Sequence, residues 1–154
     1  MNGSRPLREA IRAALRTEKE AMDFYRAAAQ RLSDPEAAAL FSRLAREERQ
    51  HAYSFYTLDR RHGDLPPFED LLATPPDTTS SWWRALQSLA AENFTAQAAL
   101  RLAIAEERRL ETELRTAAAG IDDLRARSIY LANAASTQCH WRSLEALYAE
   151  RYGA

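Results

Sequence analysis

The chain has 154 residues, of which 46% are hydrophobic and 28% are charged, and this composition is typical of one globular domain rather than a disordered chain. A net charge of −1 gives no electrostatic reason to expect nucleic acid or an anionic membrane surface as a partner. The apolar runs are too short to span a bilayer, the first residues lack the apolar core of a signal peptide, and Cys139 is the only cysteine. We therefore expect no internal disulfide, no cysteine metal knuckle, and a reducing, cytoplasmic setting.

Apolar residues recur in steps of three and four along most of the chain, and the low glycine and proline content favours long helices over a sheet. The pattern predicts a single all-α domain over residues 1–154 with four long helices, at about 7–32, 35–60, 95–119 and 122–148. The connection at 61–94 is rich in proline and small polar residues, which predicts a crossover with room for a short extra helix at 81–92. The tryptophans of that short helix are expected to form a lid over one end of the core.

Several residues are typical of helix ends. Ser33 with Glu36 fits a capping box, Thr95 and Asp122 suit the start of the third and fourth helices, and Gly120 suits the end of the third. His62 and Gly63 are interpreted as the end of the second helix, with the glycine as its cap.

Polar residues interrupt each apolar stripe near its middle. Phe41, Leu44, Phe55 and Leu58 share a stripe with a carboxylate and an imidazole three residues apart, Glu48 and His51. A buried carboxylate needs a partner, and a metal ion would serve both side chains. The alternative is a Glu-x-x-His pair that is solvated or bound to an arginine. The other inward polar residues are Glu18, Glu107, Asn133, Thr137 and His140.

A faint internal repeat relates the two halves of the chain. A shift of 89 residues places Glu18 on Glu107 and His51 on His140 without a gap, and it also aligns apolar pairs such as Phe41 with Tyr130. Two αα-hairpins of one pattern, joined by a long crossover, describe a four-helix bundle with pseudo-twofold symmetry. The repeat makes a chance placement of these inward polar residues a poor explanation, and it favours a metal site.

The donor set indicates which metals suit such a site. Carboxylates neutralise and bridge cations, and neutral imidazole favours iron, manganese or zinc over calcium and magnesium. A glutamate from each of two helices plus a Glu-x-x-His from each of the other two is the ligand pattern of ferritin-like di-metal carboxylate proteins.

The chain resembles the di-iron domain of rubrerythrins, within the ferritin-like superfamily, over roughly residues 7–148. The resemblance lies in Glu18 followed six and seven residues later by Phe24-Tyr25, in the pattern from Phe41 through Leu44-Ala45 and Glu48 to His51, and in Ala99-Leu100 through Ala103-Ile104 to Glu107. The fourth helix departs from the family: His140 is in place, but Thr137 stands where rubrerythrins have a glutamate.

The resemblance implies a role for each matching residue. Glu18 and Glu107 would be terminal ligands, Glu48 would bridge two metals, and His51 and His140 would each serve one metal. Because Thr137 removes the second bridge, the affinity for the second metal is expected to drop, and water, hydroxide or an external anion would have to fill the gap.

Three further side chains bear on the site, and two of them, Tyr25 and Asn133, allow two interpretations each. Tyr25 could hydrogen-bond a ligand carboxylate or simply fill the core. Asn133 could donate an oxygen to a metal or be a hydrogen-bonded core residue. Cys139 precedes His140 and so points about 100° away from it, and we expect a small buried hydrophobe there.

Two functions follow from this resemblance. The first is a metal-binding protein, potentially a di-iron oxidoreductase acting on peroxide or dioxygen. The printed sequence shows one cysteine and no rubredoxin-type segment, so electrons would come from an external donor. The second is a bundle with one metal or none that serves in metal binding, storage or protein interaction. Family behaviour also suggests a homodimer.

Overall fold

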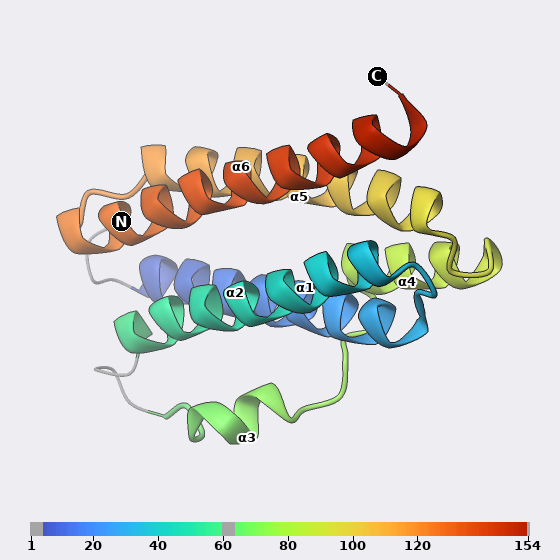
Figure 1. Ribbon diagram of the computed structural model, residues 1–154. Coiled ribbons are helices and arrows are strands. Elements are labelled where there is room, and N and C mark those ends of the chain that lie inside the picture. The colour runs from blue at the N-terminus through green and yellow to red at the C-terminus, as the bar shows by residue number, and fades with distance from the viewer. Residues whose placement is uncertain (1–4, 60–63, 154) are drawn as a thin grey trace.

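The computed structural model describes residues 5–59 and 64–153 of the chain. Six helices form within these ranges, and Figure 1 shows them: α1 (Arg5–Arg31), α2 (Pro35–Asp59), α3 (Phe68–Leu72), α4 (Ser81–Ala91), α5 (Ala96–Ala119) and α6 (Leu124–Tyr152). The described residues contain no strand, which confirms the all-α, ferritin-like class. None of the described helices is both long and apolar enough to cross a membrane.

The four long helices form two antiparallel hairpins that lie one above the other (Figure 1). α1 packs along α2 and α5 packs along α6, whereas contacts between the two hairpins are much sparser. Each helix buries the stripe expected of it: Phe41, Leu44 and Phe55 of α2 are fully buried, as is Leu144 of α6. The packing thus follows the helical period of the sequence.

The helix ends agree with the sequence analysis in part. Thr95 accepts a hydrogen bond from the backbone N–H of Ala98, and α5 ends at Gly120, both as predicted. The capping box at Ser33 is wrong, because the Asp34 carboxylate accepts the backbone N–H groups of Glu36 and Ala37 instead. Likewise Asp123, not Asp122, caps α6 through the backbone N–H of Ala126. The predicted helix end at His62 and Gly63 lies outside the described residues.

The crossover carries two short helices rather than one. The predicted helix forms as α4, and its Trp82 packs against the rings of Phe24 and Tyr25 at centroid distances of 5.3 and 5.6 Å. The additional helix α3 lies outside the bundle on the α1–α2 side (Figure 1), where Phe68 meets the ring of Tyr53 edge-on and that of Tyr56 at a tilt.

Two buried charged residues of α1 hold the crossover in place. Lys19, the only lysine of the sequence, is 3% exposed, and its ammonium group donates to the Asp23 carboxylate at 2.5 Å and to the carbonyl oxygen of Thr74 at 2.6 Å. Both oxygens of the Glu20 carboxylate accept the backbone N–H of Asp77 at 3.1 Å. The crossover is therefore tied to α1 directly beside Glu18.

Candidate metal centre

The structure brings the five predicted ligand residues together in the middle of the bundle. Glu18 comes from α1, Glu48 and His51 from α2, Glu107 from α5 and His140 from α6. The three carboxylates are 0% exposed, and the histidines are 8% and 2% exposed. Each residue lies on the stripe that its helix turns towards the others, so helical spacing alone accounts for their convergence.

Distances between the side chains divide the cluster into two halves that share Glu48. In the first half, the Nδ1 atom of His51 lies 3.5 Å from the Glu18 carboxylate and 3.6 Å from that of Glu48. In the second half, the Nδ1 atom of His140 lies 2.8 Å from Glu48 and 3.4 Å from Glu107. The two imidazole rings are stacked, with centroids 5.1 Å apart and planes 10° from parallel. This arrangement has the pseudo-twofold symmetry that the repeat predicts.

The polar atoms that face the centre have no hydrogen-bond partner within the described chain. They are both oxygens of Glu18, both oxygens of Glu48, Oε2 of Glu107, Nδ1 of His51 and both ring nitrogens of His140. Buried polar groups are normally paired, and an unpaired buried carboxylate is especially costly. Glu48, His51 and His140 each offer one ligand atom, and these atoms lie within 4.8 Å of one another. The donor set therefore fits a cation.

Two contacts from outside the cluster orient its members. The Nε2 atom of His51 lies 2.9 Å from the hydroxyl oxygen of Ser136, which leaves Nδ1 free to face the carboxylates. The buried Tyr25 hydroxyl donates to Oε1 of Glu107 at 2.7 Å. Such contacts fix ligand rings and carboxylates in metalloproteins. The structure thus decides the alternative for Tyr25: it hydrogen-bonds a candidate ligand. Sequence reasoning missed Ser136, whose only signal was its place one residue before Thr137.

The ionisation of the cluster is strongly perturbed. Burial and repulsion from Glu48 raise the pKa of Glu18 well above its usual value and raise the pKa of Glu107 to about 7. Burial alone would raise the pKa of Glu48, but its closeness to Glu18, His140 and His51 outweighs burial and lowers it. Burial would also lower the pKa of the histidines, yet the carboxylates beside them raise it to about 11 for His51 and about 10 for His140. The buried centre thus disfavours the charged form of Glu18 and Glu107 and stabilises positive charge beside Glu48.

On α6, Thr137 stands where the resemblance to rubrerythrins implies a glutamate. Thr137 is 0% exposed and its hydroxyl donates to the carbonyl oxygen of Asn133 at 2.8 Å, within α6. The amide nitrogen of Asn133 donates to Ser54 at 3.0 Å and to the carbonyl oxygen of Ile129 at 2.7 Å, as expected of a hydrogen-bonded core residue. Cys139 is exposed, so the expected burial of its thiol is wrong: a side chain turned away from the inward stripe of α6 meets solvent.

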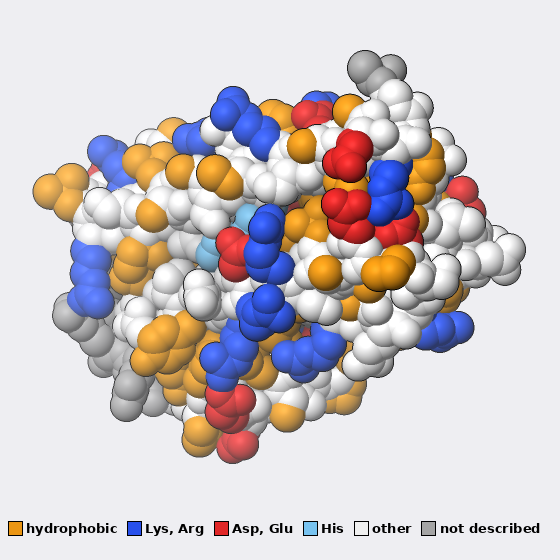
Figure 2. All heavy atoms as spheres, in the orientation of Figure 1, with side chains coloured by type: hydrophobic (Ala, Val, Ile, Leu, Met, Phe, Trp, Pro, Cys, Tyr) orange, Lys and Arg blue, Asp and Glu red, His pale blue; other side chains and the backbone are white. Residues whose placement is uncertain are grey.

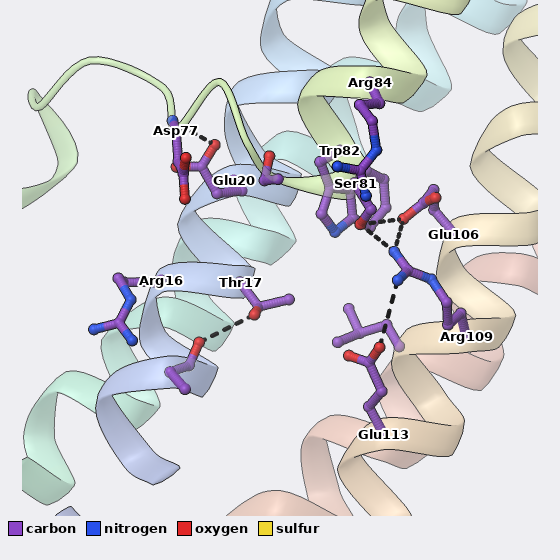
Figure 3. Close-up of a pocket in the computed structure, with 13 residues that line it drawn as sticks. Arg16, Thr17, Glu20, Asp77, Ser81, Trp82, Arg84, Glu106, Arg109 and Glu113 are labelled. Atoms are coloured by element: carbon purple, nitrogen blue, oxygen red, sulfur yellow. Dashed lines mark hydrogen bonds and ion pairs between the residues drawn. The ribbon is translucent and has the colours of Figure 1, made fainter. Parts of the chain in front are cut away.

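The two long sides of the bundle differ at the level of the centre. On the side that α2 and α6 form, histidine atoms reach the surface between arginine and glutamate side chains (Figure 2). The opposite side holds a cavity of about 330 Å³ between α1, α4 and α5, in which Ser81, Glu106 and Arg109 are hydrogen-bonded to one another (Figure 3). None of the five predicted ligands lines this cavity. The nearest surface to the histidines is therefore the α2–α6 side.

Comparison with known proteins supports the interpretation of the cluster as a metal site. The family described as Rubrerythrin matches residues 2–65, a segment that contains α1 and α2 with Glu18, Glu48 and His51. Neither the curated proteins nor the solved structures gave a match. The family match and the cluster of Glu48, His51 and His140 support a metal-binding protein. The first hairpin is thus similar to the Rubrerythrin family, and the described helices have the all-α, ferritin-like architecture.

Proposed function

We propose that this protein binds two divalent metal ions, iron in the first instance, and uses them to reduce peroxide or dioxygen. The observation that supports this most is the set of buried carboxylate oxygens and imidazole Nδ1 atoms that four helices direct at one another, none of which has a hydrogen-bond partner among the described residues outside the cluster apart from Oε1 of Glu107. Manganese and zinc suit the same donors, so the identity of the metal has to be measured.

Each residue has a defined place in this proposal. Glu18 and His51 would hold one ion, Glu107 and His140 the other, and Glu48 would contribute to both because its carboxylate lies within 3.6 Å of both Nδ1 atoms. Ser136 keeps the His51 ring in the orientation in which Nδ1 faces inward, and Tyr25 holds the Glu107 carboxylate.

The bound metals would supply electrons to the oxidant, and an external donor would restore them. The chain's own residues would bind the metals and orient the ligand side chains. The apolar residues that surround the centre, among them Phe41 and Phe55, exclude bulk water and so strengthen every electrostatic contact inside. The histidines reach the surface with only 8% and 2% of their area exposed, so a molecule of the size of peroxide or dioxygen would approach the centre more readily than a large substrate.

Metal analysis of protein purified without a chelator tests the proposal. We expect about two iron ions per chain and oxidation of the reduced protein by hydrogen peroxide, followed by a change in the absorption of the iron. The control is a variant in which Glu48 and His51 are both replaced by alanine, which should hold no iron. One metal or none, with no reaction with peroxide, would refute an oxidoreductase of this kind.

The second candidate function is a bundle with one metal or none that serves in metal binding, storage or protein interaction. The observation that favours it is Thr137, because its neutral side chain leaves Glu48 as the one carboxylate that the two halves of the cluster share. A protein that retains one tightly bound metal but does not turn over peroxide would support this alternative.

We also propose that the protein acts in the cytoplasm and forms a homodimer. A single, exposed cysteine suits a reducing compartment. Bundles of this architecture frequently pair through helix faces, and sedimentation of the purified protein would test the dimer.

A further inference from the structure

Thr137 occupies a position in α6 that corresponds to the position of the Glu48 carboxylate in α2. On α2, Glu48 precedes His51 by three residues, and on α6, Thr137 precedes His140 by the same interval on an equally buried stripe. The threonine side chain is short, because its hydroxyl and methyl groups are attached directly to Cβ. A glutamate in this place would extend its carboxylate between the two halves of the cluster. The Thr137 hydroxyl hydrogen is also turned back to its own helix, towards the carbonyl oxygen of Asn133.

The charges at the centre do not balance without a further anion. Three buried carboxylates, those of Glu18, Glu48 and Glu107, would face at least four positive charges from two divalent ions. An uncompensated charge in a buried site is costly, so a fourth negative charge would stabilise the second ion.

No other carboxylate of α2 or α6 in the described chain takes this place. Glu47 lies at the outer edge of the cluster, 3.7 Å from the Nε2 atom of His140, and it pairs with Arg43. Glu145 of α6 pairs with Arg108 at the surface. Glu47 and Glu145 are thus engaged elsewhere, and a compensating anion would come from solvent.

The surface on the α2–α6 side carries arginines as well as carboxylates. A groove of about 550 Å³ runs between α2 and α6, and its polar lining consists of Arg43, Arg46, Ser143, Glu36 and Glu150. Ser143 lies one helical turn from His140, and Arg43 lies one turn from Glu47. Figure 2 shows arginine side chains around the point where the histidines reach the surface. Guanidinium groups attract carboxylates, and Arg46 is the arginine of this groove that would attract a small anion, since Arg43 pairs with Glu47.

From these observations we propose that a small carboxylate anion, such as formate or acetate, binds beside Thr137 in the place of the absent glutamate and completes the second metal site. This inference rests on the proposed binding of two metals, and it concerns only what fills the place of the absent glutamate. The protein would then hold one metal independently of the medium and the second metal together with the anion.

Titration with cobalt(II) tests the site, because cobalt replaces iron at such ligands and reports its coordination through visible absorption. The wild-type protein, freed of metal, is titrated in perchlorate and again with formate or acetate at the same ionic strength. We expect the second equivalent of cobalt to bind at least about tenfold more tightly with the carboxylate present, accompanied by a change in the cobalt spectrum, while the first equivalent is unaffected.

Two substitutions sharpen the test. Thr137→Glu supplies the carboxylate from the chain, so its second equivalent should bind tightly and show no response to formate. Gln138→Glu adds the same charge at the neighbouring position, which is off the inward stripe, and should keep the response of the wild type. Thr137→Ala should also keep it, because alanine leaves the space open.

The outcomes separate this inference from the proposed function. Two equivalents that bind with the same affinity in perchlorate and formate would overturn the anion site and leave the two-metal proposal intact, with water or hydroxide as the remaining ligand. A single equivalent under all conditions would overturn both the anion site and the two-metal centre. The wild-type titration gives this answer even if Thr137→Glu does not fold.

Discussion

Replacement of Glu107 by glutamine isolates the contribution of one buried charge to metal binding. Oε1 of Glu107 lies 3.4 Å from the Nδ1 atom of His140, so a cation bound by that nitrogen lies within about 4 Å of the carboxylate. At this distance, and with an effective dielectric constant of about 20, one unit charge contributes roughly 4 kcal/mol for each unit of cation charge. For a divalent ion this is roughly 8 kcal/mol, so loss of that charge corresponds to a fall in affinity of about a millionfold for the second metal. The first metal, near Glu18 and His51, should remain.

A glutamine at position 107 should preserve the other contacts of this side chain. Its amide oxygen can still accept the hydrogen bond from Tyr25, and its neutrality suits a position where burial raises the pKa of the native carboxylate to about 7. The unfolding free energy of the metal-free variant should therefore stay within about 1 kcal/mol of the wild type in urea titration.

Metal content after dialysis, with isothermal titration for the affinities, provides the measurement. Glu106→Gln is the matched control, because Glu106 is the neighbouring residue on α5 but pairs with Ser81 and Arg109 on the outer side of the helix. It should keep the wild-type stoichiometry. Glu48→Gln should weaken both metals, since its carboxylate serves both halves. Equal loss in Glu106→Gln and Glu107→Gln, or no loss in either, would refute the assignment of Glu107.

Three further predictions follow from other contacts. Tyr25→Phe removes the donor to Glu107 and should weaken the second metal by about 10- to 100-fold, measured by the same titration, with an unchanged circular dichroism spectrum. Lys19→Met leaves the Asp23 carboxylate and the carbonyl of Thr74 without their buried partner, and it should lower the unfolding free energy by about 2–3 kcal/mol in urea while metal content is unchanged. In the metal-free protein, the pKa of Glu107 is raised on folding from 4.5 to about 7, so its stabilising contribution is complete below pH 4.5 and is lost as the pH rises through 7. The melting temperature of metal-free protein should therefore fall between about pH 5 and pH 8, whereas the metal-loaded protein should show the opposite trend because its ligands bind metal when deprotonated.

Sequence periodicity was sufficient for the bundle and for the residues at its centre. The inward position of Glu18 or His140 is fixed by the step of three or four from apolar neighbours, and this local rule holds as long as the helix is regular. The repeat then related the two hairpins, which no single stripe could do. The role of these residues as metal ligands stays a prediction.

The contacts that sequence reasoning missed depend on positions that helical period does not fix. The start of a helix shifts by one residue at little cost, so Asp34 and Asp123 cap where Ser33 and Asp122 were expected. Ser136 reaches His51 across two helices, and only the relative height of α2 and α6 brings them together. The burial of Lys19 depends on the path of the crossover, for which the sequence carries no periodic signal.

The unequal packing of the four long helices has a consequence for folding. Because each hairpin has extensive contacts within itself and few with its counterpart, the two hairpins are natural units of partial unfolding, joined by the crossover and by side chains that meet at the centre. An ion held by Glu48 of one hairpin and His140 of the other would be shared between these units. Amide hydrogen exchange should then report one cooperative opening in the loaded protein and two separate openings after chelation, so a bound metal would act as a folding link as well as a redox group.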